Sequence, residues 1–163
     1  MADLREDHRA WITSWTFQWL DAVNRQAGRV LDVPDHGEGQ VEILLFVGAL
    51  RNVLRGAEAI LGKEHAAVRS FYEAVPGAMD IRDMLEHFDE YVTGSGRLQK
   101  GKSPDWLVFY SSDREAGGER AIHVAGRELD VETAAAAAGT LAAAAMNEPS
   151  ITPVSNEPKG EGK

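Results

Sequence analysis

The sequence contains no cysteine among its 163 residues. Disulfide bonds, zinc–thiolate sites, iron–sulfur clusters and thiol nucleophiles are therefore excluded, because each of them requires a cysteine sulfur. Glycine patterns typical of a P-loop or of a dinucleotide-binding turn are also missing. A metal would have to be held by carboxylate oxygens and imidazoles alone. We predict neither a metal nor another cofactor.

Long apolar runs are missing as well. No stretch approaches the ~18 consecutive apolar residues that read as a membrane-spanning helix. The N-terminal residues Met1 to Asp7 are mostly charged, whereas a signal peptide carries an apolar stretch. We therefore expect a cytoplasmic protein without a membrane partner.

Positive charge is scarce. Lysine and arginine number 17 against 26 aspartates and glutamates, so the formal net charge is −9. This balance opposes broad binding to nucleic acid, which depends on neutralising phosphates with basic side chains. Any contact with RNA must be local. The composition, 44% hydrophobic and 26% charged, is typical of a packed globular protein.

Apolar residues recur at steps of three and four over much of the chain, which is the pattern of amphipathic helices. We predict helices from Arg5 to Ala27, from Gln40 to Leu61, around residues 68–75 and from Met79 to Val92. The second is apolar nearly all round at its start, so we place it at the centre of a bundle or at a dimer interface. Aromatic area dominates burial energetics, and we interpret the tryptophans of the first helix as a core ridge in preference to the alternative, a stacking platform for bases or a small ligand. They are Trp11, Trp15 and Trp19.

The C-terminal third combines short strands, one further helix and a tail. Alternating apolar residues and glycine-containing loops predict a small antiparallel meander at about 106–129. Asp130 is a good N-cap for an alanine-rich helix that reaches Met146. Residues 147–163 hold three prolines and few apolar residues, and we predict that they are disordered. The predicted fold is mainly α: a bundle of four or five helices over residues 1–146, with the β meander inserted before the last helix.

One short segment combines groups that can carry chemistry. Arg82 is a permanently charged, planar anion binder, and His87 titrates near neutrality. A histidine can deprotonate the 2′-hydroxyl of RNA or protonate the leaving oxygen, while an arginine stabilises the charge that builds on the phosphorus. Such a reaction needs no metal. The pair is therefore a candidate for metal-independent RNA cleavage.

An arginine, a polar residue and a histidine four to six positions after the arginine, on a helix of an all-α bundle, resemble the HEPN superfamily. Arg82, Asp83 and His87 fit this motif, within a similar region of about Gln40 to Val92. The resemblance implies a dimerising helical domain, often a metal-independent ribonuclease of toxin–antitoxin or phage-defence systems, with two motifs meeting at the dimer interface. Arg82 and His87 would then be catalytic, Asp83 would orient them, and an antitoxin would be a possible protein partner.

Geometry and charge place two demands on this candidate site. On a regular helix Arg82 and His87 lie about 140° apart, so the pair requires an irregular first turn at Arg82 or a contribution across a dimer. The segment is also rich in acidic residues, which repel phosphate. A basic loop follows at residues 93–103, and we predict that it folds back to bind phosphate. Its cations are Arg97, Lys100 and Lys102.

A non-catalytic interpretation stands beside this one. Arg82 can form a helical salt bridge with Glu86, and His87 can contact Asp83 or Glu90 one turn away. The chain would then be a helical interaction module that binds or oligomerises through its apolar second helix and its alanine-rich last helix. As a third alternative, the helix face formed by Asp83, His87 and Glu90 could hold a divalent metal.

Overall fold

The computed structural model describes the backbone of residues 6–32, 39–98, 108–112, 120–124 and 126–148, and the side chains of all of these except 108–112 and 120. Two of the three predicted phosphate-binding residues, Lys100 and Lys102, lie outside the described residues. The predicted tail lies outside them from residue 149 onward.

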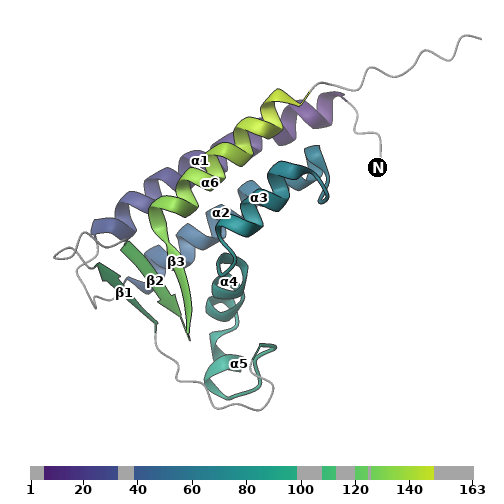
Figure 1. Ribbon diagram of the computed structural model, residues 1–163. Helices are drawn as coiled ribbons and strands as arrows, with labels where there is room; N and C mark the ends of the chain where they lie inside the picture. Colours follow the sequence, from purple (N-terminus) through teal and green to yellow (C-terminus); the bar gives the residue numbers. More distant parts are fainter. Residues whose placement is uncertain (1–5, 33–38, 99–107, 113–119, 125, 149–163) are drawn as a thin grey trace, which may run out of the picture.

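Within the described residues the chain forms six helices and one three-stranded antiparallel sheet in the order β1-β2-β3 (Figure 1). The predicted fold class, mainly helical with a small antiparallel sheet before the last helix, is confirmed. The elements are α1 Glu6–Asp32, α2 Gln40–Leu61, α3 Ala66–Ala74, α4 Ala78–Glu86, α5 Phe88–Val92, β1 Val108–Ser112, β2 Arg120–Val124, β3 Arg127–Asp130 and α6 Val131–Asn147. The helices number six rather than four or five because the segment predicted as one helix from Met79 to Val92 is divided at His87.

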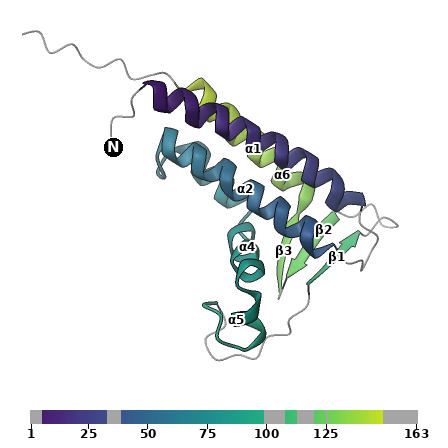
Figure 2. The same ribbon diagram turned by 180° about the vertical axis from the view of Figure 1, so that it is seen from behind.

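The helix α2 lies at the centre of the molecule, as its sequence predicts. It packs against α1, α6, α4 and α3, and Figures 1 and 2 show it between α1 on one side and α4 on the other. Phe46, Leu50 and Leu54 are completely buried. Burying side chains of this size contributes about 1.5–3 kcal/mol each, so α2 is the main source of core stability.

The helices α1 and α2 approach closely at one point. Thr16 of α1 is completely buried, and its hydroxyl donates a hydrogen bond to the carbonyl oxygen of Ile12 at 2.7 Å. It faces Gly56 of α2, where an added Cβ would lie 2.0 Å from the Thr16 Oγ1. A side chain at position 56 therefore requires Thr16 or one of the two helices to shift.

The sheet leads directly into α6. Ile122 of β2 pairs with Leu129 of β3, and both are buried against the helices. The Asp130 carboxylate then accepts a hydrogen bond from the Thr133 amide at 2.5 Å, which confirms the predicted N-cap of the last helix. Alanines on one side of α6 are buried where it packs against α1 and α2: Ala134, Ala138, Ala142 and Ala145.

The strand β3 also positions α4. The Arg127 Nε donates to the Asp80 Oδ2 at 3.0 Å. At Gly77, just before α4, an added Cβ would lie 2.8 Å from the carbonyl oxygen of Glu128. These contacts hold the start of α4 against the sheet, while its end points away from the bundle (Figure 1).

The prediction of a buried tryptophan ridge on α1 is wrong. Trp11 is 65% exposed, and Trp15 and Trp19 are only partly buried. Each step of four residues turns by about 40° around a helix, so this row drifts from the outside of α1 at Trp11 toward the core at Trp19. The residues that bury the helix are instead Thr16, Val23, Ala27 and Val30.

Candidate functional site

The corner between α4 and α5 carries the residues that the sequence singles out. The chain leaves helical geometry at His87, which has φ −115° and ψ 36°. Its amide ends α4 by donating to the Asp83 carbonyl oxygen at 3.1 Å, and its own carbonyl oxygen accepts from the Glu90 amide at 3.0 Å to begin α5. The irregularity expected at Arg82 therefore lies at His87, and Arg82 sits inside a regular helix.

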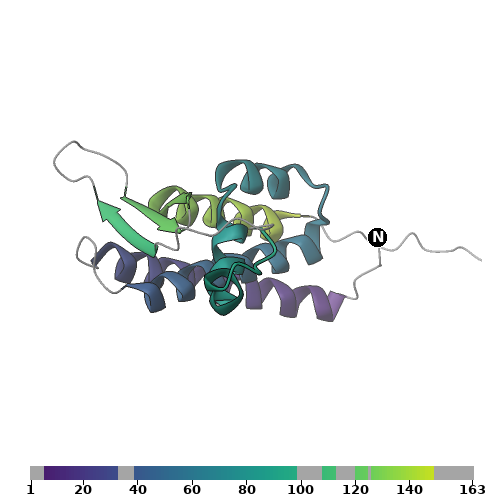
Figure 3. The same cartoon turned by 90° about the horizontal axis from the view of Figure 1, so that it is seen from below.

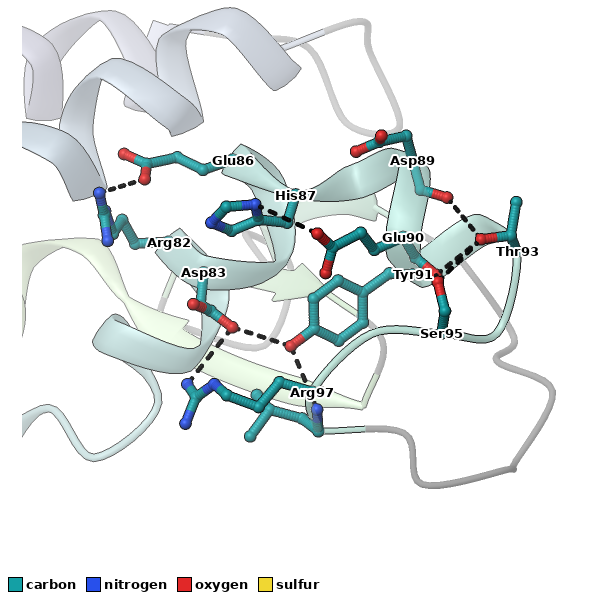
Figure 4. Close-up of polar contacts among 11 residues, drawn as sticks. Arg82, Asp83, Glu86, His87, Asp89, Glu90, Tyr91, Thr93, Ser95 and Arg97 are labelled. Carbon is teal, nitrogen blue, oxygen red and sulfur yellow. Dashed lines mark hydrogen bonds and ion pairs between the residues drawn. The ribbon is translucent and has the colours of Figure 1, made fainter.

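Tyr91 gives the physical reason for this break. The Tyr91 side chain is 1% exposed, and its hydroxyl donates to the Asp83 Oδ2 at 2.9 Å. Eight residues of continuous helix span about 12 Å along the axis, which is too far for a tyrosine to reach back to Asp83. The change of direction at His87 brings the two together (Figure 4).

The Asp83 carboxylate and the Tyr91 hydroxyl are the centre of a polar cluster. The Arg97 Nη2 lies 3.3 Å from the Asp83 Oδ2, and the Leu98 amide donates to the Tyr91 hydroxyl oxygen at 3.3 Å (Figure 4). Burial raises the pKa of Tyr91, and the hydrogen bond to Asp83 raises it further. The cluster holds the tyrosine in its neutral form.

A tight turn closes over the tyrosine ring. Gly94 has φ +80°, a conformation that favours glycine. The amides of Ser95 and Gly96 both donate to the Glu90 carbonyl oxygen, at 2.8 and 3.1 Å. At Gly96 an added Cβ would lie 2.4 Å from the Tyr91 ring. The glycine therefore allows the backbone to lie directly on the ring.

The three predicted catalytic residues contact different partners. Arg82 forms an ion pair with Glu86. The His87 Nδ1 lies 3.9 Å from the Glu90 Oε1, and both of these side chains are about half exposed, at 52% and 53%. Asp83, predicted to orient the other two, contacts Tyr91 and Arg97 instead. The two glutamate contacts are those that the non-catalytic interpretation predicts.

The predicted basic loop is represented by Arg97. Its side chain is 69% exposed and folds back onto Asp83, so it offsets one carboxylate of the acidic segment. Phosphate binding at the corner would require such a reduction of its negative charge. Among the described residues, no group of three histidines, aspartates or glutamates is arranged to hold a metal ion. The alternative metal site on the helix face of Asp83, His87 and Glu90 is not formed, because the Asp83 carboxylate turns toward Tyr91.

A second surface lies on α1, where the sequence favours a core ridge over a stacking platform. The rings of Trp11 and Trp15 are stacked with centroids 6.3 Å apart and an interplanar angle of 22°, and those of Trp15 and Trp19 meet edge to face at 5.8 Å. A shallow open hollow lies beside them on the outer side of the helix. It is lined by Trp15, Gln18, Trp19, Asp21, Ala22 and Arg25.

No protein-family model, no curated protein and no solved structure matches this chain. The HEPN resemblance therefore stays a prediction. Among the helices that the structure describes, none has the length and apolar character needed to cross a membrane.

Sequence reasoning missed the role of Tyr91 and preferred a buried ridge to an exposed surface on α1. The contact of Tyr91 was not visible in the sequence, because in a continuous helix this residue would lie about 12 Å along the axis from Asp83. The exposure of Trp11 did have a sequence signal: spacing of four, repeated, drifts around a helix by about 40° per step. A row that begins on the core side at Trp19 must therefore leave it by Trp11.

Proposed function

We propose that the chain is a protein-interaction module that binds a partner chain through the outer face of α1. The observation that carries this proposal is the 65% exposure of Trp11, stacked on a partly buried Trp15. Tryptophan is enriched in the buried centres of protein interfaces. A partner that covers these rings would remove a large apolar area from water. The expected binding faces of α2 and α6 are less suitable, because most of their apolar residues are used in the core.

A photo-crosslinking amino acid at Gln18 tests this function. Gln18 lies in the hollow beside the tryptophans, whereas Asn24 is an exposed residue on the same helix, about 120° around from it. We expect protein adducts from position 18 and few from position 24 when the full chain is irradiated in its cells of origin. Equal labelling from both positions, or none from position 18, contradicts the proposal. Identification of the adducts by mass spectrometry shows whether the partner is the same chain.

Metal-independent RNA cleavage is the second candidate function, as proposed from the HEPN resemblance. Two observations favour it. The His87 imidazole is about half exposed at the end of α4, and Arg97 folds over the acidic segment beside it. RNA would then bind locally at this corner, with Arg82 and His87 as catalytic residues, and the active form would be a homodimer that an antitoxin-like partner could restrain.

RNA cleavage in EDTA separates the two functions. If the corner is catalytic, His87→Ala lowers the rate about 10²- to 10⁴-fold, which is the usual contribution of a general acid or base. His8→Ala is the matched control, because His8 is an exposed histidine on α1, outside this corner. Wild-type protein that leaves single-stranded RNA intact, or a His87→Ala variant as active as wild type, excludes the enzyme.

A further inference from the structure

We infer that the partner of α1 is a second copy of this chain, with the two α1 helices paired antiparallel about a two-fold axis near residue 20. This inference rests on the proposed interaction function and names its partner. It follows from a pattern along the outer face of the helix that is complementary to itself when reversed.

The outer face of α1 carries one continuous row of residues. Its members are separated alternately by four and three positions, which keeps them in line along a helix. They lie on the side away from the buried residues Thr16, Val23 and Ala27, and each is exposed or partly buried. The row consists of Trp11, Trp15, Gln18, Ala22, Arg25 and Arg29.

The two halves of this row differ in chemistry. The N-terminal half presents two indole rings, and the C-terminal half presents two guanidinium groups. In an antiparallel pair with its axis at residue 20, Trp15 of one protomer faces Arg25 of its partner, and Trp11 faces Arg29. Arginine stacks favourably on tryptophan. The smaller residues meet at the centre, where Gln18 faces Ala22.

The positions that flank the row are placed by the same axis. The two-fold axis brings the same flank of each helix together, so Trp19 of one protomer lies near Trp19 of its partner, and Asp21 lies near Asp21 of its partner. The two Asp21 carboxylates are each offset by the Arg25 guanidinium of the same helix. Arg25 already pairs with Asp21 of its own helix through its N–H edge, which leaves the flat face of its guanidinium for stacking.

The outer side of α1 is accessible. The helix packs mainly on α2 and α6, and Figures 2 and 3 show it along one edge of the molecule. From Trp11 to Arg29 the row is about 27 Å long. The α4–α5 corner lies on the other side of α2 (Figure 1). Pairing through α1 therefore leaves the two corners apart, unlike a dimer built around Arg82 and His87.

Sedimentation equilibrium of the full chain tests the pairing. We expect wild-type protein to be dimeric at about 100 µM, because a dimer with a micromolar or lower Kd is well populated at that concentration. Trp15→Arg places arginine opposite arginine at two symmetry-related points and weakens the dimer about 100-fold. Adding Arg25→Trp to this variant exchanges the two residues and restores pairing, because each tryptophan again faces an arginine. Circular dichroism confirms that the variants are folded.

Phe88→Ala is the control for non-specific association, since Phe88 is 58% exposed on α5, away from α1. We expect this variant to dimerise like wild type. A monomeric wild type, a dimer that Phe88→Ala disrupts, or an exchange variant that does not recover, overturns the inference. If the purified chain is monomeric while position 18 crosslinks to a different protein, the second-copy inference fails and the interaction function stands. If position 18 gives no adduct at all, both fail.

Discussion

Gly56→Ala lowers the free energy of unfolding by about 3 kcal/mol, although alanine is the better helix former. The new methyl group would lie 2.0 Å from the Thr16 Oγ1, 3.1 Å from its Cβ and 3.4 Å from its Cγ2. Thr16 is completely buried, so α1 and α2 must separate or the threonine must leave its rotamer. Either change disturbs the largest helix contact in the molecule. Urea denaturation followed by circular dichroism measures the loss.

Two variants show whether this loss comes from the Thr16 contact. Gly48 lies on the same helix, and an added Cβ there meets nothing within 4 Å. Gly48→Ala therefore raises the free energy of unfolding by about 0.5–1 kcal/mol through helix propensity. Thr16→Ala in the Gly56→Ala background removes the oxygen that clashes and recovers most of the loss. Equal effects of the two glycine substitutions, or no recovery in the double variant, contradict this account of the helix crossing.

Tyr91→Ala lowers the free energy of unfolding by about 3–5 kcal/mol, the usual cost of emptying a buried aromatic site. The ring is covered by the turn at Gly96 and its hydroxyl is bonded to Asp83. Tyr91→Phe keeps the ring and loses only the hydroxyl contacts with Asp83 and the Leu98 amide, so it costs about 1–2 kcal/mol. Chemical denaturation of both variants gives these values. A Tyr91→Phe variant as unstable as Tyr91→Ala would mean that the polar cluster, rather than the buried ring, holds the corner.

The stability of wild-type protein also falls at alkaline pH. Burial and the hydrogen bond to Asp83 raise the pKa of Tyr91 in the folded protein above the ordinary value of 10.0. The unfolded chain therefore loses this proton first, and the contribution of Tyr91 is fully present below about pH 10 and is lost as the pH rises through the folded pKa. Tyr91→Phe makes the fall shallower.

Tyr72→Phe is the matched control for this pH dependence. Burial and the hydrogen bond to Glu58 raise the pKa of Tyr72 as well, but its side chain is 41% exposed, so solvent weakens the effect. We expect the alkaline fall to change less in Tyr72→Phe than in Tyr91→Phe. The free energy of unfolding measured at several pH values between about 8 and 11 decides this.

The placement of the helices followed largely from local patterns. The central position of α2 was visible in its nearly continuous apolar surface, and the start of α6 was visible in Asp130. Both can be read within one segment. An apolar helix surface must be covered by neighbouring elements, and the free amides at the start of a helix need an acceptor. The antiparallel sheet before α6 was predictable for the same reason.

Contacts between distant segments could not be derived in this way. Whether Trp11 is covered depends on which neighbours α1 has, and the helices α2 and α6 pack on Thr16 and Val23 instead. The close approach at Gly56 exists only because α1 crosses α2 at that turn. Spacing within a segment shows that the tryptophan row drifts around α1, but it does not show which side of α1 is covered or where α1 crosses α2.

The candidate corner shows the same division. Residue types alone established that an arginine, a carboxylate and a histidine lie within six positions, because their chemistry does not depend on the fold. Folding determined what these groups touch. The break at His87 turned Tyr91 onto Asp83 and left Arg82 and His87 with separate glutamates, since burial of one aromatic ring outweighs the continuity of a single exposed helix.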